Sequence, residues 1–176
     1  MTRGVRRELP RDISPMPHGD AHRDSSWLLV LRRYLRVSLG GHLVWEIAQL
    51  PLYTIFWSGT PARNAYAVLH CTAGDMIIAS TALIAPLVAL DSARWPGDRV
   101  SYSRIAMFAI ALGFAYTVFS EWLNTSVRHA WSYTAAMPVV PPLGTGLVPL
   151  LQWVIVPTLA FLVAHKCAAQ PQAQVA

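Results

Sequence analysis

The chain has 176 residues, which is enough for one domain. Hydrophobic residues make up 54% of the chain and charged residues only 13%, against roughly 25% charged in soluble domains. This composition argues against a soluble domain and favours a protein embedded in a membrane. We expect no nucleic-acid partner, because the basic residues behind the net charge of +5 are placed as signals of membrane topology.

The first 26 residues differ in character from the rest of the chain. Residues 1–26 are rich in Arg, Pro, His and Asp and have no hydrophobic periodicity, which predicts a disordered cytoplasmic arm. Residues 27–166 are predicted to form a transmembrane domain, and residues 167–176 a cytoplasmic tail. Four mainly apolar stretches in this domain match the roughly 20 residues that cross a bilayer as a helix: 35–56, 65–90, 105–124 and 147–165. The sequence therefore predicts an all-α polytopic membrane protein with four transmembrane helices in an antiparallel bundle.

The basic residues indicate how these helices are oriented. Twelve of the 14 Lys and Arg residues lie before or at the start of the first stretch, in the join 91–104, or after the last stretch. Only Arg63 and Arg128 lie in the other two joins. By the positive-inside rule, both termini are cytoplasmic. We expect a multi-pass protein of the bacterial inner (cytoplasmic) membrane whose basic arm contacts anionic membrane lipids. The sequence leaves open whether the protein forms a homo-oligomer.

Three acids and a histidine interrupt the apolar stretches: Glu46, Asp75, Glu121 and His70. An ionised carboxylate in hydrocarbon costs several kcal/mol, so such groups face a bundle interior, pair, hold a proton or line a wet cavity. At about 1.5 Å per residue, Glu46 and Asp75 lie about 15 Å below the outer ends of their helices. Glu121 lies within about 5 Å of its outer end by the same rise. The polar groups therefore gather in the outer half of the membrane.

These four residues are the candidate catalytic residues, because a carboxylic acid in apolar surroundings can act as a general acid. Six further side chains near the same depth are candidate substrate-binding residues: Gln49, Tyr53, Asn124, Trp131, Tyr133 and Gln152. Aromatic ring faces among them can stabilise a cationic intermediate. The first function hypothesis is acid/base modification of an apolar small molecule, a lipid or an isoprenoid. No cofactor is implied.

Helical spacing orients some of these groups. His42, Glu46, Gln49 and Tyr53 follow one another at intervals of four, three and four residues, which places them on one helical face. His70 and Asp75 are five residues apart and point in different directions. Pro51 is expected to loosen the helix that carries Glu46.

Other interpretations of the same residues stay open. A small-ligand or proton-coupled binding or transport module would use the acids to take up protons. A metal site would use nitrogen and oxygen ligands from the three acids and His70. A purely structural interpretation pairs Glu121 with Arg128 and joins Gln49 to Gln152, with interhelical hydrogen bonds worth about 1 kcal/mol each. The join 125–146 is either an interfacial aromatic belt or a lid over a cavity.

Four strings carry a resemblance: WEIAQLPLY, HCTAGD, SEWLN, and WSY followed by MP and GTGLVPLLQW. Over about residues 35–165, they resemble a family of small bacterial four-helix integral membrane proteins. The resemblance implies a four-helix membrane topology and no particular chemistry. Glu121, Trp131 and Tyr133, before a last helix led by Gly and Pro, are more faintly similar to lycopene-cyclase-type carotenoid domains. Those domains carry paired acids after the proline of the last helix, where Pro149 is followed here by two leucines and a glutamine.

Overall fold

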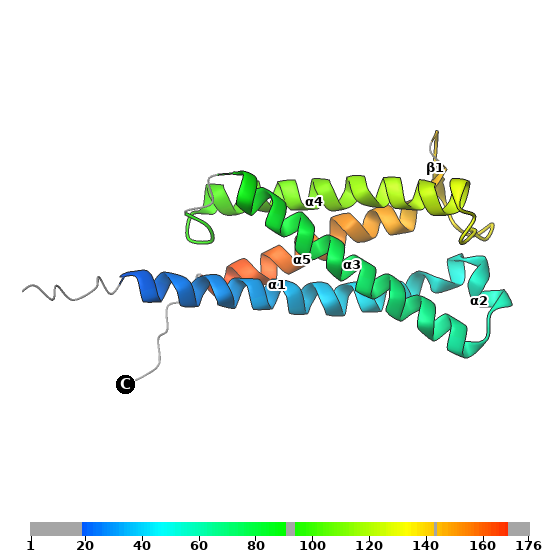
Figure 1. Ribbon diagram of the computed structural model, residues 1–176, viewed down its shortest axis with the longest axis horizontal. Coiled ribbons are helices and arrows are strands. Elements are labelled where there is room, and N and C mark those ends of the chain that lie inside the picture. Colours follow the sequence, from blue (N-terminus) through cyan, green and yellow to red (C-terminus); the bar gives the residue numbers. More distant parts are fainter. Residues whose placement is uncertain (1–18, 91–93, 143, 169–176) are drawn as a thin grey trace, which may run out of the picture.

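The computed structural model describes residues 19–90, 94–142 and 144–168, and these are mostly helical (Figure 1). Four long helices make up the body: α1 (Gly19–Gln49), α3 (Pro61–Ala89), α4 (Arg99–Trp122) and α5 (Leu147–Ala168). The prediction of an all-α protein is confirmed. Three segments are long and apolar enough to cross a membrane by length and composition: Pro61–Ala89, Arg99–Val127 and Leu147–Lys166.

Helix α1 does not meet that criterion over its described residues, although it is 31 residues long. Its first half carries three arginines, and its second half carries Ser38, His42, Glu46 and Gln49. These polar residues lower its mean hydropathy, so three of the four predicted spans are candidates by length and composition. The side chains of Ser38, His42, Glu46 and Gln49 are all buried, which means that they face the other helices.

Several predicted boundaries differ from the observed ones. Helix α1 begins at Gly19, so residues 19–26 are helical and not part of a disordered arm, while residues 1–18 lie outside the described part. No proline or glycine interrupts residues 20–39, and an established helix extends at little cost. Helix α4 begins at Arg99 and not at residue 105, because the Asp98 side chain caps it by accepting from Ser101 N at 2.7 Å.

Short elements close one end of the molecule. Helix α1 ends at Gln49, and a 3-10 turn, η1 (Leu50–Leu52), precedes the short helix α2 (Thr54–Ser58). Pro51 lacks the N–H group that would continue α1, so the predicted helix 35–56 is broken near its end. A π-helical turn, η2 (Leu123–Val127), extends α4. Strands β1 (Val139–Val140) and β2 (Thr145–Gly146) pair antiparallel just before α5.

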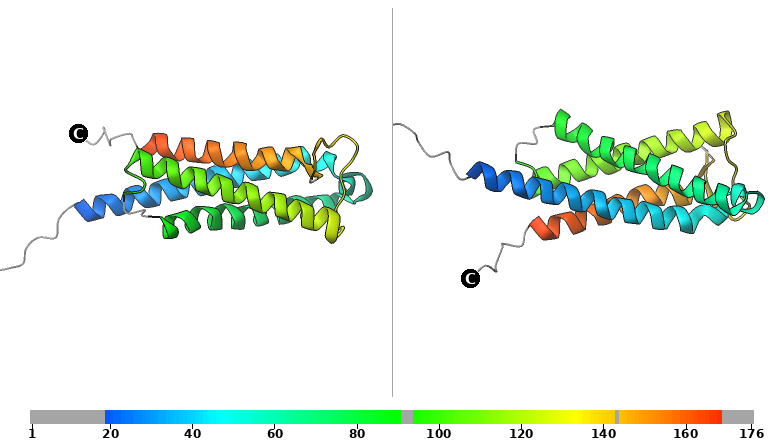
Figure 2. Two further views of the ribbon diagram at one scale, coloured as in Figure 1. Left: turned by 90° about the horizontal axis from the view of Figure 1, so that it is seen from above. Right: turned by 60° about the horizontal axis from the view of Figure 1, so that its bottom comes forward.

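Each long helix packs against two others, in the cyclic order α1, α3, α4, α5, and the α1–α5 contact is the most extensive. Helices α1 and α4 run from left to right in Figure 1, and α3 and α5 run from right to left. The two further views in Figure 2 show the same elongated arrangement. An apolar core fills the end where the α3–α4 connection lies, and includes Val30, Leu83, Ile105 and Phe161. The opposite half of the interior holds the buried polar residues.

The contact between α4 and α5 gives the first testable prediction. A Cβ atom at Gly113 would lie 2.1 Å from Cε3 of Trp153, a buried residue on α5. We expect Gly113→Ala to push the helices apart and to cost about 1–3 kcal/mol, as overpacking does. A lower midpoint of thermal unfolding in detergent would show this.

Gly40→Ala is the matched control, because a Cβ atom at Gly40 meets nothing within 4 Å. Replacing a helical glycine by alanine without a clash is neutral or stabilises by about 0.5–1 kcal/mol. Equal midpoints for the two variants would contradict the close approach of α4 and α5.

Candidate functional site

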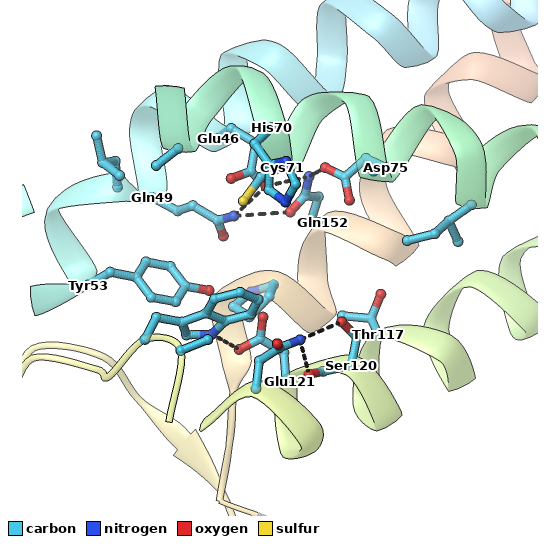
Figure 3. Close-up of a pocket in the computed structure, with 18 of the residues that line it drawn as sticks. Glu46, Gln49, Tyr53, His70, Cys71, Asp75, Thr117, Ser120, Glu121 and Gln152 are labelled. Atoms are coloured by element: carbon cyan, nitrogen blue, oxygen red, sulfur yellow. Dashed lines mark hydrogen bonds between the residues drawn. The ribbon is translucent and has the colours of Figure 1, made fainter. Parts of the chain in front are cut away.

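A cavity of about 400 Å³ lies between the long helices at the polar end of the molecule (Figure 3). All four candidate catalytic residues, Glu46, His70, Asp75 and Glu121, are among its lining residues. Five of the six candidate substrate-binding residues also line it: Gln49, Tyr53, Asn124, Trp131 and Gln152. The sixth, Tyr133, does not line the cavity but contacts Glu121. The structure therefore gathers the sequence candidates around one space.

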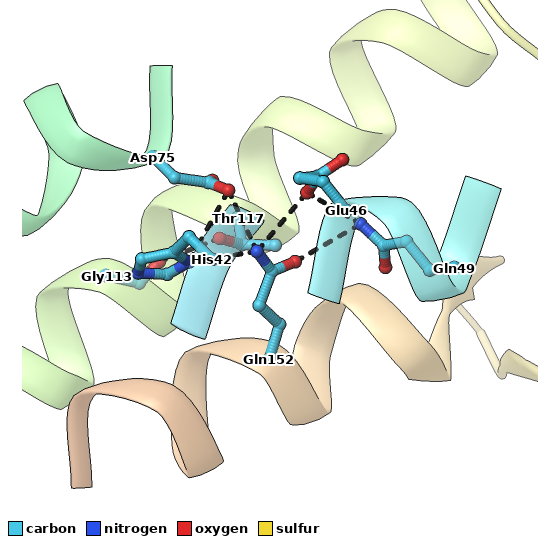
Figure 4. Close-up of polar contacts among 7 residues, drawn as sticks. All are labelled: His42, Glu46, Gln49, Asp75, Gly113, Thr117 and Gln152. Atoms are coloured by element: carbon cyan, nitrogen blue, oxygen red, sulfur yellow. Dashed lines mark hydrogen bonds and ion pairs between the residues drawn. The ribbon is translucent and has the colours of Figure 1, made fainter. Parts of the chain in front are cut away.

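Gln152 on α5 is the centre of the first polar group (Figure 4). Its Nε2 atom donates to Asp75 Oδ2 at 2.8 Å and to Glu46 Oε1 at 3.2 Å, and lies 2.9 Å from His42 Nδ1. Gln49 Nε2 donates to Glu46 Oε1 at 2.7 Å and to Gln152 Oε1 at 3.2 Å. All five side chains are buried. We call these residues (His42, Glu46, Gln49, Asp75 and Gln152) the Gln152 cluster; it joins α1, α3 and α5.

The Gln152 cluster has more acceptors than hydrogens around its central nitrogen. Gln152 Nε2 carries two hydrogens but faces three atoms that can accept them. His42 Nδ1 also lies 3.4 Å from Asp75 Oδ2. An amide nitrogen only donates, so Gln152 Nε2 cannot give a hydrogen of its own to all three atoms. If His42 Nδ1 carries a hydrogen, Nδ1 can donate to Asp75 Oδ2, and the two amide hydrogens are left for Glu46 and Asp75. The hydrogen bonds of the cluster therefore depend on which atoms of His42 carry hydrogen.

Glu121 forms a second acidic centre, which lies on the other side of the cavity in Figure 3. It is buried on α4, and its Oε2 atom accepts from the Tyr133 hydroxyl and from Trp131 Nε1 at 3.5 Å. Burial, and then the Glu121 carboxylate, raise the pKa of Tyr133, so Tyr133 keeps its proton and donates it. The Tyr133 oxygen in turn accepts from Gly146 N at 3.0 Å.

The suggested ion pair between Glu121 and Arg128 is not among the contacts of the described residues, where His42–Asp75 is the one charge pair found. Arg128 is exposed and lines the cavity, while Glu121 takes its hydrogen bonds from two aromatic residues of the following loop. The loop folds back over the end of α4, so it reaches Glu121 from a side that helical spacing does not reveal.

The loop that carries Trp131 and Tyr133 lies over one end of the cavity. Thr54 N donates to Ser132 O at 2.9 Å, and Thr134 N donates to Leu52 O at 2.9 Å. These bonds are possible because the chain is extended at Tyr53, just after the break at Pro51. Since Trp131 also lines the cavity, this geometry favours the lid interpretation of the loop over a purely interfacial belt.

His70 is the one candidate catalytic residue that stands apart from both acidic centres. It is exposed, and its ring stacks on that of Tyr66 with centroids 5.6 Å apart. In the described part of the chain, no group of three or more His, Cys, Asp or Glu side chains is placed to hold a metal ion. The metal hypothesis therefore gains no support from the geometry.

His42 belongs to the site although it was not among the candidate residues. It is fully buried, its ring lies 5.0 Å from that of Trp153, and its Nε2 atom has no hydrogen-bond partner among the described residues. Its spacing of four residues from Glu46 was the signal that could have placed it there. The partnership with Gln152, 110 residues away, has no local signal in the sequence.

Comparisons of the chain with protein-family models, with curated proteins and with solved structures found no match. The function therefore has to be inferred from the chemistry of the cavity.

The cluster gives the second prediction. Gln152→Leu keeps a similar volume but removes both donors, and leaving buried polar groups unsatisfied costs about 1–3 kcal/mol or more. We expect a lower thermal midpoint for Gln152→Leu in detergent, and little change for Leu151→Ala, an exposed neighbour on the same helix.

A double-mutant cycle with Asp75→Asn tests whether the residues act as one network. Residues in one hydrogen-bond network show coupling of about 0.5–3 kcal/mol. Strictly additive losses in Gln152→Leu, Asp75→Asn and the double variant would show that the two residues are independent.

Proposed function

We propose that the protein is a multi-pass membrane protein in which α1, α3, α4 and α5 all cross the bilayer as an antiparallel bundle. Support for α1 as the fourth span comes from its two faces. The polar residues of its second half, from Ser38 to Gln49, point inward, while Leu39, Val44 and Ile47 lie on its exposed side, with Val44 67% exposed. Lipid would thus contact an apolar surface on α1, even though the helix as a whole is too polar to meet a hydropathy criterion.

The same proposal puts both termini in the cytoplasm of a bacterium and the cavity in the outer half of its inner membrane. The distribution of Lys and Arg supports this orientation, since Arg63 and Arg128 are the two exceptions among 14. Arg63 lies in the first turn of α3 and Arg128 after η2, both at the end that holds the cavity. The apolar core then occupies the cytoplasmic half.

For the activity, we propose general acid/base modification of a lipid or isoprenoid held in the cavity. The observation that carries this proposal is the pair of separate acidic centres, the Gln152 cluster and Glu121, that line one largely apolar cavity. In such a reaction, Glu46 or Asp75 gives a proton to a carbon–carbon double bond and forms a carbocation. Glu121 then removes a proton from a neighbouring carbon and restores a double bond. The proton that Glu121 has taken must return to Glu46 or Asp75 before the next turnover, so that the substrate is isomerised with no net gain or loss of protons.

The ring faces of two cavity residues suit this chemistry. Trp131 and Trp153 both line the cavity, and aromatic faces stabilise a nearby cation by about 0.5–2 kcal/mol. Trp131 also donates to Glu121, which keeps this ring beside the proposed base. The hydrogen bond from Tyr133 holds Glu121 in place and marks it as an acceptor at the start of the reaction.

Amide replacements test the activity. We expect Glu46→Gln, Asp75→Asn and Glu121→Gln each to lower the rate by about 100-fold or more, since general acid/base catalysis contributes about 100- to 10,000-fold. Lipid extracts of cells that express each variant, compared by mass spectrometry with extracts from wild-type expression and from an empty vector, give the readout.

Asp98→Asn is the matched control, because it makes the same chemical change at the N-cap of α4, where asparagine also caps well. The lipid product should persist in this variant. Unchanged product in all three cavity variants would contradict the proposed activity.

A second candidate function, proton-coupled binding or transport of a small ligand, is favoured by the surplus of acceptors around Gln152 Nε2. A hydrogen that moves between His42 and Asp75 could couple protonation to ligand binding. We expect His42→Gln, which can still hydrogen-bond but cannot titrate, to abolish protonophore-sensitive accumulation of a labelled metabolite extract by membrane vesicles. Product formation without any such accumulation would favour the enzyme instead.

A further inference from the structure

We propose that the cavity opens sideways between α3 and α4 to the surrounding lipid, and that it takes a long-chain molecule whose head group is an uncharged or cationic hydrogen-bond donor, a hydroxyl or an amine. This inference rests on the proposed function, for which it names the route and the head-group chemistry of the ligand. It is carried by the packing of the cavity walls and by the polar atoms that line them.

The wall between α3 and α4 is incomplete. The two helices separate toward the cavity end in Figure 1. A Cβ atom at Gly74, a cavity-lining residue of α3, would meet nothing within 4 Å. Ile77 on α3 and Tyr116 on α4 line the cavity and are yet 67% and 49% exposed. Residues that are both lining and exposed mark places where the cavity reaches the outer surface, and Ile77 and Tyr116 mark one between α3 and α4. Arg128 and Ala130 are also lining and exposed, and mark a second one beside the loop that follows α4.

Tight contacts hold α5 against two of its neighbours. Between α4 and α5, a Cβ atom at Gly113 would lie 2.1 Å from the ring of Trp153, which lines the cavity. Between α1 and α5, a Cβ atom at Gly41 would lie 2.8 Å from Val156 Cγ1, and neither of these residues lines the cavity. The loop that is bonded to η1 and α2 through Thr134 and Thr54 lies over one end of the cavity. Beside Gly74, where a Cβ atom would meet nothing within 4 Å, no such contact narrows the gap between α3 and α4.

The size of the cavity also favours a lateral opening. About 400 Å³ is near the lower end of the roughly 300–1,000 Å³ typical of ligand pockets. A long hydrocarbon chain fits such a space only if its head lies inside and its tail remains in the bilayer. Apolar residues flank the opening and suit the tail, among them Ile77 and Ile78.

The polar lining selects the head group. Glu46, Asp75 and Glu121 are acidic and buried. The amide hydrogens of Gln49 are already directed at Glu46 and at Gln152 Oε1, and those of Gln152 at Glu46 and Asp75. Gln49 Oε1 is a buried acceptor with no partner among the described residues, and Gln49 lines the cavity. Arg128 also lines the cavity, but it is exposed. The buried part of the lining thus offers acceptor atoms to a ligand, and its acids would repel a phosphate or a carboxylate.

Photocrosslinking tests both parts of the proposal. Wild-type protein in phosphatidylcholine vesicles is irradiated with a diazirine-bearing hexadecanol, and mass spectrometry identifies the labelled peptides. In the wild type, we expect labelling of the cavity segments of α3 and α4. In Gly74→Leu, we expect this labelling to fall by about tenfold, which is equivalent to 1.4 kcal/mol. A diazirine-bearing fatty acid of the same length should label these segments about tenfold less than the alcohol.

Gly40→Leu is the matched control, because Gly40 is also a helical glycine with free space around its Cβ position but does not line the cavity. The Gly40→Leu variant should be labelled by the alcohol probe to the same extent as the wild type. If Gly74→Leu does not fold, Ile77→Trp decides, since its exposed side chain lies at the same opening.

Each outcome bears on a different part. Undiminished labelling in Gly74→Leu, or in Ile77→Trp, would overturn the lateral opening. Labelling by the fatty acid that equals labelling by the alcohol would overturn the head-group assignment. Failure of the acid/base activity is recognised separately, as normal alcohol labelling in the wild type together with lipid products that the three amide variants leave unchanged.

Discussion

The arrangement of this protein depends on one buried primary amide, that of Gln152. Helices in lipid gain little from burying apolar surface against one another, so close packing and interhelical hydrogen bonds determine which faces meet. The Gln152 amide bonds Glu46 on α1 and Asp75 on α3 through a single nitrogen. Its donors belong to an uncharged group, and both acids that it bonds remain among the residues that line the cavity.

The interior is divided between an apolar half and a polar half, and the division positions the site. In the apolar half, Tyr34, Leu83, Ile105 and Phe161 pack as a conventional core. That packing fixes the long helices at one end, and the close approach of Gly113 to Trp153 keeps α5 against α4 farther along. Gln152 is the neighbour of Trp153 in sequence, so the same contact sets the position of the cluster. Polar groups held by rigid helices keep a defined geometry.

The sequence predicted those elements that depend on residues close together in the chain. Apolar length predicted three helices, and the rise per residue placed Glu46 and Asp75 at a shared depth, where the structure joins them through Gln152. The partners of Glu121 could not be predicted, because Tyr133 reaches it only after the loop has bonded to η1. Helix α1 does not meet the hydropathy criterion because its polar residues lower the average, and an average does not distinguish a buried polar face from an exposed one.

The two acidic centres and the lateral opening answer a single chemical requirement. A carbocation formed in the cavity would be captured by water, so acid/base chemistry of this kind needs a site from which water is excluded. The loop bonded through Thr54 and Thr134 lies over one end of the cavity, and the apolar residues Ile77 and Ile78 line it near Gly74. In the proposed mechanism, a ligand that comes from the lipid brings its own hydrocarbon to fill the gap beside Gly74. Entry from the bilayer and exclusion of water from that gap would then have the same cause.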